Sequence, residues 1–319
     1  MADMDHLYNG PLPPPNQSNQ ATTPTASSRA AQHHHITSIA MPANLPPPLP
    51  PSHGGRTGTG TLPPPMSSNE SFSNFFESWI AEQSRDLEEL RAAVSVEPAR
   101  PEADLQRLVD QVLGHYAQYY SAKAAAAADD VNMMFTPSWT STTEHLYLWC
   151  GGWRPTAALQ LLYTKSGMQL QQQLPVFLDG GGLKDDLSDL RAVELQAADQ
   201  LQHRTITRER EIEEVAASAQ EALTSKTMVE LAGGGGLDAG AMDREMQKKA
   251  EGMRRVLEMA DGLRLETMRE VVALLRPAQA VHFLLAAAEL HLAVHDFGRR
   301  KDGHAGNAAA AAAAASPSE

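Results

Sequence analysis

The sequence predicts an all-α protein, a helical bundle with long antiparallel helices that follows a disordered Pro-rich N-terminal tail. Three observations lead to this prediction. Apolar residues recur at helical spacing over three long stretches of the chain. No stretch shows the alternation of β-branched residues that is typical of a strand. Prolines and glycines interrupt the helical stretches at the places where turns are expected.

Residues 1–66 contain three Pro-Pro-Pro runs, and their charged side chains are two aspartates and two arginines. Such a segment cannot bury enough apolar surface to offset chain entropy, so we expect it to be disordered. The net charge of −13 therefore falls on the rest of the chain. An acidic domain argues against direct nucleic-acid binding through phosphate neutralisation. Residues 1–66 also hold no basic helix or heptad repeat, so no DNA-reading helix is expected.

The helices are expected where an apolar stripe lies between a start signal and a stop signal. Pro101 and Pro155 suit the first position of a helix, and Ser141 with Glu144 has the spacing of a capping box. The glycine run 233–236 allows two long helices to return antiparallel. The expected helices cover about 71–94, 101–128, 142–149, 155–167, 188–223, 243–275 and 277–298.

These helices define one domain over about 70–300, and the Ala-rich residues 301–319 are expected to be a second disordered tail. The single cysteine, Cys150, excludes a disulfide within the chain and is expected to be a buried, inert thiol. No apolar run reaches roughly 18 residues and the first residues lack an apolar signal core, so we expect a soluble intracellular protein without a membrane partner.

The motifs of several common enzyme classes are missing. The chain has no Gly-rich phosphate loop followed by Lys-Ser/Thr, no Gly-x-Ser-x-Gly elbow and no His-Glu-x-x-His zinc motif. No pair of carboxylates stands out on an apolar helix face. The sequence therefore predicts that the protein is not an enzyme.

His291 and His295 are the residues best suited to hold a ligand. They lie four residues apart on the last expected helix, so both project from one side and flank an apolar stripe, which predicts partial burial. A His-x-x-x-His pair can chelate zinc or copper, and one member can ligate haem iron axially. The alternative, which spacing alone favours, is two histidines satisfied by hydrogen bonds inside the bundle.

Five segments between about residues 70 and 300 carry recognisable motifs. They are Phe75-Phe76-x-x-Trp79, Trp139-Thr-Ser-x-x-Glu144, Leu148-Trp-Cys-Gly-Gly-Trp-Arg-Pro155, Ala260-Asp-Gly-Leu-Arg264 and Leu290-His-Leu-x-x-His295. Together these motifs resemble the Delay of Germination domain family of plants. The combination of the Gly-Gly-Trp-Arg-Pro segment with the motif of the last helix is specific for this family.

The resemblance implies a regulatory role. The same domain forms the C-terminal half of TGA-type bZIP transcription factors, but neither a basic region nor a leucine zipper is found here. The chain is therefore more similar to the stand-alone members of the family. Those proteins are associated with seed dormancy, germination, abscisic-acid signalling, binding of type 2C protein phosphatases, and haem.

The resemblance also assigns residues. The haem association of the family rests on the two histidines of the Leu-His-Leu-x-x-His motif, which are His291 and His295 here, so haem is the expected cofactor. The phosphatase-binding region of the family lies near the aromatic first helix, which makes Phe75, Phe76 and Trp79 the expected partner-binding residues. Aromatic anchors suit such an interface, although packing against the bundle would equally occupy these side chains.

We therefore expect a non-enzymatic regulator in the nucleus and cytoplasm that binds a type 2C protein phosphatase or a bZIP transcription factor. The alternative function is a transcriptional co-regulator that borrows DNA binding from the bZIP partner. The basic cluster 299–301 is weak support for nuclear import. A metal-dependent enzyme is a third hypothesis, and it lacks a general base beside the histidines. A homo-oligomer is compatible with the sequence.

Overall fold

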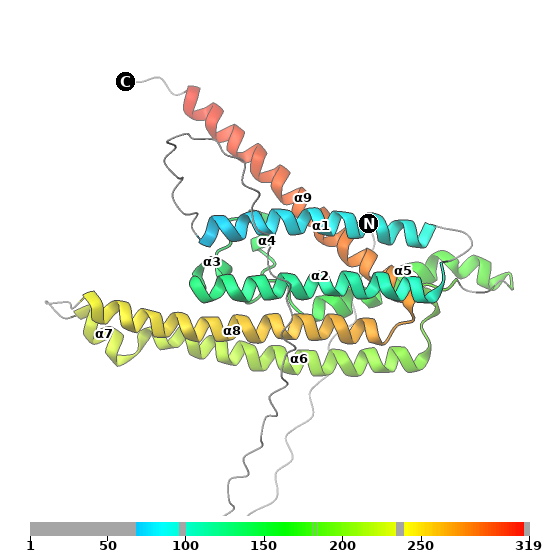
Figure 1. Ribbon diagram of the computed structural model, residues 1–319, viewed down its shortest axis with the longest axis horizontal. Helices are drawn as coiled ribbons and strands as arrows, with labels where there is room; N and C mark the ends of the chain where they lie inside the picture. The colour runs from blue at the N-terminus through cyan, green and yellow to red at the C-terminus, as the bar shows by residue number, and fades with distance from the viewer. Residues whose placement is uncertain (1–67, 96–99, 181, 183, 234–238, 316–319) are drawn as a thin grey trace, which may run out of the picture. The chain divides into compact units, whose positions relative to one another are not determined.

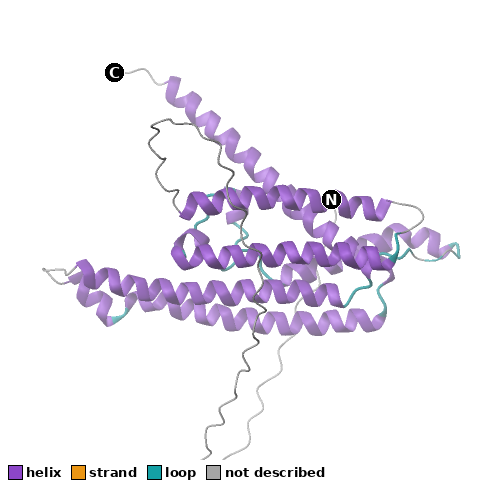
Figure 2. Ribbon diagram, in the orientation of Figure 1, coloured by secondary structure: helices purple, strands orange, loops and turns teal. Residues whose placement is uncertain are grey.

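The computed structural model describes residues 68–95, 100–180, 182, 184–233 and 239–315. Helices fill most of this part of the chain, and no strand occurs within it (Figure 2). The prediction of an all-α protein is therefore confirmed. Residues 1–66, which the sequence predicts to be disordered, lie outside the described residues.

The described helices stack as neighbours. Figure 1 shows α1, α2, α8 and α6 side by side in that order, and α9 packs against α1, α2, α4 and α5. In chain order the elements are α1 (Ser68–Ser95), α2 (Glu102–Asp129), α3 (Asn132–Phe135), α4 (Thr142–His145), α5 (Thr156–Leu178), the 3₁₀ turn η1 (Leu187–Asp189), α6 (Ala192–Glu221), the 3₁₀ turn η2 (Ala222–Thr224), α7 (Lys226–Gly233), α8 (Ala239–Ala273) and α9 (Pro277–Ala315).

Two glycines that were expected to end helices do not end them. Helix α5 continues through Gly167 to Leu178, and α9 continues through Gly298 to Ala315. A glycine inside a helix costs about 1 kcal/mol relative to alanine. Alanine has the highest helix propensity of the amino acids, so the alanine run near the end of α9 offsets the cost of its glycines. Helix α9 thus extends as far as Ala315 into the segment 301–319 for which the sequence predicts a disordered tail, and the last four residues lie outside the described part.

The segment after the capping box also differs from the helix that the sequence predicts there. Helix α4 stops at His145, whereas the sequence pattern predicts a helix through residue 149. Leu146 and Tyr147 are exposed, so the apolar run there is not the buried face of a helix. The capping box itself is confirmed, because Ser141 accepts from the Glu144 backbone and the Glu144 side chain accepts from the Ser141 backbone.

The main apolar core joins helices from both ends of the domain. Leu90 of α1, Val109 of α2, Leu159 of α5 and Phe283 of α9 have no exposed surface. Complete burial of such a side chain contributes roughly 1.5–3 kcal/mol each. A second, aromatic cluster lies beside this core and includes Phe72, Phe76, Trp79 and Trp139. This aromatic cluster borders the candidate site.

Helix α9 has the length and mean hydropathy of a membrane-spanning helix over part of its course. Among the described residues, its segment Pro277–His304 is the one helix that length and composition would allow to cross a bilayer. Half of the apolar window is buried inside the domain. The apolarity of α9 is therefore that of a core helix, because a helix packed on several sides is hydrophobic over most of its surface.

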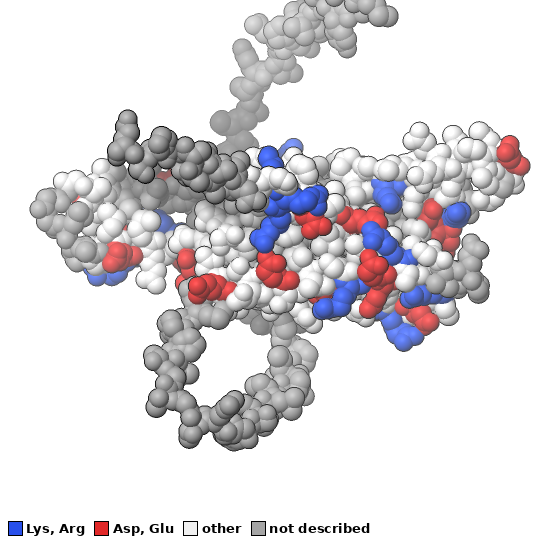
Figure 3. All heavy atoms as spheres, turned by 90° about the horizontal axis from the view of Figure 1, so that it is seen from above, with Lys and Arg blue, Asp and Glu red and all other residues white. Residues whose placement is uncertain are grey.

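Charges of both signs alternate on the face shown in Figure 3. Helix α1 carries ion pairs at i,i+3 spacing, such as Arg91 with Glu88 and Arg85 with Glu82. A basic stripe of the kind that tracks a nucleic-acid backbone is not visible on this face.

Candidate functional site

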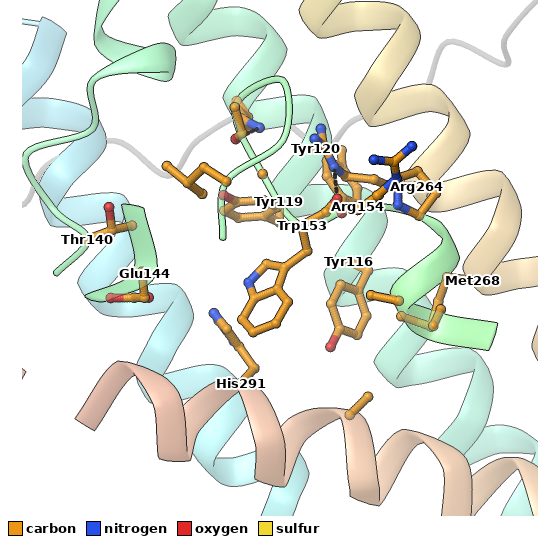
Figure 4. Close-up of a pocket in the computed structure, with 18 of the residues that line it drawn as sticks. Tyr116, Tyr119, Tyr120, Thr140, Glu144, Trp153, Arg154, Arg264, Met268 and His291 are labelled. Carbon is orange, nitrogen blue, oxygen red and sulfur yellow. Dashed lines mark hydrogen bonds between the residues drawn. The ribbon is translucent and has the colours of Figure 1, made fainter. Parts of the chain in front are cut away.

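An aromatic cavity lies between α1, α2, α9 and the loop that follows α4. Its volume is about 180 Å³. A dry apolar cavity of roughly 150 Å³ is enough to hold a molecule as large as benzene, so this one is large enough for a small ligand. Figure 4 shows Trp153, Tyr116 and His291 facing one another across it. The aromatic and imidazole residues that line it are Phe76, Trp79, Tyr116, Tyr119, Tyr120, Trp139, Trp153 and His291.

His291 is held inside this cavity as a neutral imidazole. Burial lowers the pKa of His291 to about 4. Its Nδ1 lies 2.6 Å from the Oε1 of Gln83, whose own Nε2 donates to the hydroxyl of Tyr116 at 2.9 Å. Because an amide oxygen only accepts, the Nδ1 of His291 carries the proton. Its Nε2 then holds a lone pair, and no described residue forms a hydrogen bond with it.

His295 has a different environment. It is buried outside the cavity, its ring is 5.8 Å from that of Phe76, and its Nδ1 lies 3.2 Å from both carboxylate oxygens of Glu144. Burial alone would raise the pKa of Glu144, but the hydrogen bonds from His295 and Ser141 lower it to about 2. His295 therefore fastens α9 to the capping box of α4. The structure does not bring the two predicted ligands into one site.

The predicted partner-binding residues are mostly interior. Phe76 and Trp79 are 2% and 9% exposed, and Phe75 is partly buried. Trp79 stacks on Tyr119 with ring centroids 4.3 Å apart, which holds α1 against α2. Phe76 and Trp79 line the cavity instead of facing solvent. Binding of a partner through this segment stays a prediction.

The loop from Trp149 to Trp153 is fixed by a charged cluster that the sequence did not reveal. Lys123 donates to Asp261 at 2.9 Å and to the carbonyl of Gly151 at 2.7 Å. Arg264 also pairs with Asp261 and donates to the carbonyls of Trp149, Cys150 and Trp153. Asp261 and Arg264 belong to a motif that the sequence analysis singled out, but nothing in the sequence pairs them with Lys123, because a lysine inside an alanine run normally faces solvent.

Close approach to this cluster explains the two glycines of the loop. Gly151 has a φ of 75°, and a Cβ there would lie 2.7 Å from the Leu257 side chain. A Cβ on Gly152 would lie 2.9 Å from the guanidinium carbon of Arg264. Cys150 is partly rather than fully buried, and burial raises the pKa of its thiol, which keeps it protonated at neutral pH.

A family model and several known proteins match this chain in sequence. A family model described as DOG1, seed dormancy control, matches residues 86–164. Protein DOG1-like 2 of Arabidopsis thaliana is 30% identical over 70% of this chain and 88% of its own length. Protein RESPONSE TO ABA AND SALT 1 of the same plant is 28% identical over 73% and 97%, respectively. Transcription factor TGA4, also from Arabidopsis thaliana, is 28% identical over 66% of this chain but only 51% of its own length.

Proposed function

The chain belongs to the DOG1 family, and from this premise we propose that it is a non-enzymatic plant regulator of seed dormancy and abscisic-acid signalling that acts by binding other proteins. The observation that carries the proposal is the extent of the similarity. It spans nearly the whole of a relative named for its response to abscisic acid and salt, but only about half of TGA4. None of the three relatives named above is named as an enzyme.

A type 2C protein phosphatase is the proposed partner, and the outer side of α1 is its proposed contact. Phe76 and Trp79 are buried, so a partner that leaves the fold intact meets the partly buried Phe75 and its exposed neighbours Asn74 and Ser78. Buried aromatic residues flanked by polar ones are common at the centre of protein interfaces. Phe76 and Trp79 then contribute by holding α1 in place.

We expect Phe75→Ala to weaken binding of a purified type 2C phosphatase at least tenfold, because truncation of an aromatic hot-spot residue costs about 2 kcal/mol or more. Biolayer interferometry with the full chain measures the affinity, and circular dichroism checks the fold. Tyr147→Ala removes an exposed aromatic ring outside α1 and is the matched control. Unchanged binding of a folded Phe75→Ala variant would contradict the contact, and no binding by the wild type would contradict the partner.

The second candidate function is that of a transcriptional co-regulator without its own DNA-binding region. The similarity to TGA4 supports it, since that factor shares the domain and acts in transcription by its name. The same similarity supports a nuclear location, whereas a cytoplasmic pool rests on the sequence expectation alone. Co-purification of the chain with a bZIP factor from nuclei, without any phosphatase, would favour this candidate over the first.

Haem is proposed to bind through His291, and the cavity as it stands is too small to enclose it. The free Nε2 of His291 is a suitable axial nitrogen in an apolar, aromatic setting. The volume of about 180 Å³, however, is below the roughly 300–1,000 Å³ of pockets that enclose drug-sized ligands. A haem macrocycle is at least as large as such ligands. Binding therefore requires the cavity to widen around His291.

We expect haem titration of the full chain to give a saturable Soret shift that His291→Gln abolishes. His295→Gln should retain the shift, because His295 lies outside the cavity and is paired with Glu144. Circular dichroism and thermal unfolding of both variants confirm that they are folded. No shift in the wild type, or the same shift in a folded His291→Gln variant, would exclude His291 as the haem ligand.

A further inference from the structure

A second cluster of ligand-type side chains lies between α1 and α2, apart from the cavity lining. Glu82 and Asp86 are four residues apart on α1 and therefore project from the same face. His115 of α2 faces them. One potential ligand atom from each of these three residues lies within 4.8 Å of the other two.

The imidazole of His115 has a carboxylate at each nitrogen. Its Nδ1 lies 2.9 Å from an oxygen of Asp86, and its Nε2 lies 3.8 Å from the Oε1 of Glu82. Arg85 pairs with the other oxygen of Glu82, Oε2, so this ion pair leaves Oε1 on the side of His115. All three groups come from the helices α1 and α2, and none of them comes from a loop.

The charge of this cluster is poorly balanced. The side chain of Asp86 is only 4% exposed, and within the described part of the chain no lysine or arginine forms an ion pair with it. A buried carboxylate beside a second carboxylate is costly unless a cation compensates it. A bound cation between the three side chains would supply that compensation.

We propose that Glu82, Asp86 and His115 form a binding site for a divalent transition-metal ion, for which zinc is the best match. One imidazole nitrogen and two carboxylates are a donor set that zinc accepts at about 2.0–2.2 Å. Calcium and magnesium prefer oxygen ligands alone, so His115 selects against them. Three protein ligands leave a coordination position for water or for a side chain of a partner.

The location gives the ion a structural consequence. Gln83, which orients His291 and Tyr116, follows Glu82 directly on α1. An ion held by α1 and α2 ties these two helices together at the edge of the aromatic cavity. Because an ion that binds only the folded chain raises its stability by mass action, thermal unfolding reports on binding independently of any partner or function.

The test is whether the full chain binds zinc. Isothermal titration calorimetry measures the affinity, and the unfolding temperature is measured with and without zinc. The wild type should bind zinc and gain unfolding temperature. His115→Gln and Asp86→Asn should weaken the affinity at least tenfold and remove the gain. Glu82→Gln should also weaken the affinity and remove the gain in unfolding temperature. Because Glu82 is partly exposed, this variant serves as the substitute if Asp86→Asn does not fold.

Two controls separate this site from other histidines. Replacing His33, His34 and His35 by alanine should leave the high-affinity site intact, and so should His203→Gln, which removes an exposed histidine that lies beside Asp199. Magnesium in place of zinc should give no gain in unfolding temperature. Zinc binding that survives His115→Gln and Glu82→Gln in folded protein, or that disappears when the histidine triplet is replaced, would overturn the proposal.

Discussion

Replacing Asp261 by asparagine is expected to lower the free energy of unfolding by about 3–5 kcal/mol, because removal of one partner leaves buried charge uncompensated. Asp261 is the carboxylate that Lys123 and Arg264 share, and all three residues are less than 10% exposed. Burial already lowers the pKa of Lys123 to about 8, although Asp261 opposes that shift. Without the carboxylate, two cations would remain in the interior.

Chemical unfolding followed by circular dichroism measures this effect. Glu258→Gln is the matched control: Glu258 lies one turn before Asp261 on α8, pairs with Arg254 at the surface and should change stability by less than about 0.5 kcal/mol. Adding Lys123→Met to Asp261→Asn should recover part of the loss, because it removes one of the two stranded cations. A loss below about 1 kcal/mol for Asp261→Asn would show that the cluster is not the main anchor of the loop.

Stability should also fall by roughly 3 kcal/mol as the pH decreases from about 6.5 to about 4, through His291 alone. Burial lowers the pKa of His291 from 6.5 to about 4. Between pH 6.5 and pH 4, His291 is protonated in the unfolded chain but neutral in the folded chain, so a fall in pH favours unfolding. Nearby Glu144 raises the pKa of His291 and His295 lowers it, and both are weaker influences than burial.

The comparison of the wild type with His291→Gln isolates this contribution. Urea unfolding at several pH values from 7.5 to 4 should show a shallower pH dependence in the variant, because glutamine does not titrate. His203→Gln, which removes an exposed histidine, should keep the wild-type slope. Glu144, whose pKa is lowered from 4.5 to about 2, adds a separate loss below about pH 4.5 in every one of these proteins. Equal slopes for the wild type and His291→Gln would contradict the buried, neutral state of His291.

The sequence predicted the helices better than their ends. Apolar spacing located the long helices because each buries one face, and the spacing of Ser141 and Glu144 located α4 because a capping box is local. The ends at Gly167 and Gly298 were wrong because a glycine costs little when its neighbours favour the helix. The helix propensity of the residues around a glycine therefore decides, as much as the glycine itself, whether the helix ends there.

The partners of the site residues could not be predicted in this way. His291 and His295 share a helix face, but their partners Gln83 and Glu144 come from residues 208 and 151 positions away. The pairing of Lys123 with Asp261 spans 138 positions. Helical periodicity reports which face is buried and carries no information on what covers it. The separation of the two histidines into different sites therefore depends on tertiary structure alone.

The packing of α1 on α9 has a consequence for how the protein is made (Figure 1). Gln83 and His291 are 208 residues apart, and a ribosome adds roughly 5–20 residues per second, so the first helix waits about 10–40 s for the last one. During that time the aromatic face of α1 can pack against α2 and Trp139, but the part of it that α9 covers stays exposed. A chain that ends before α9 would lack the helix that packs on α1, α2, α4 and α5, and could not complete the main core.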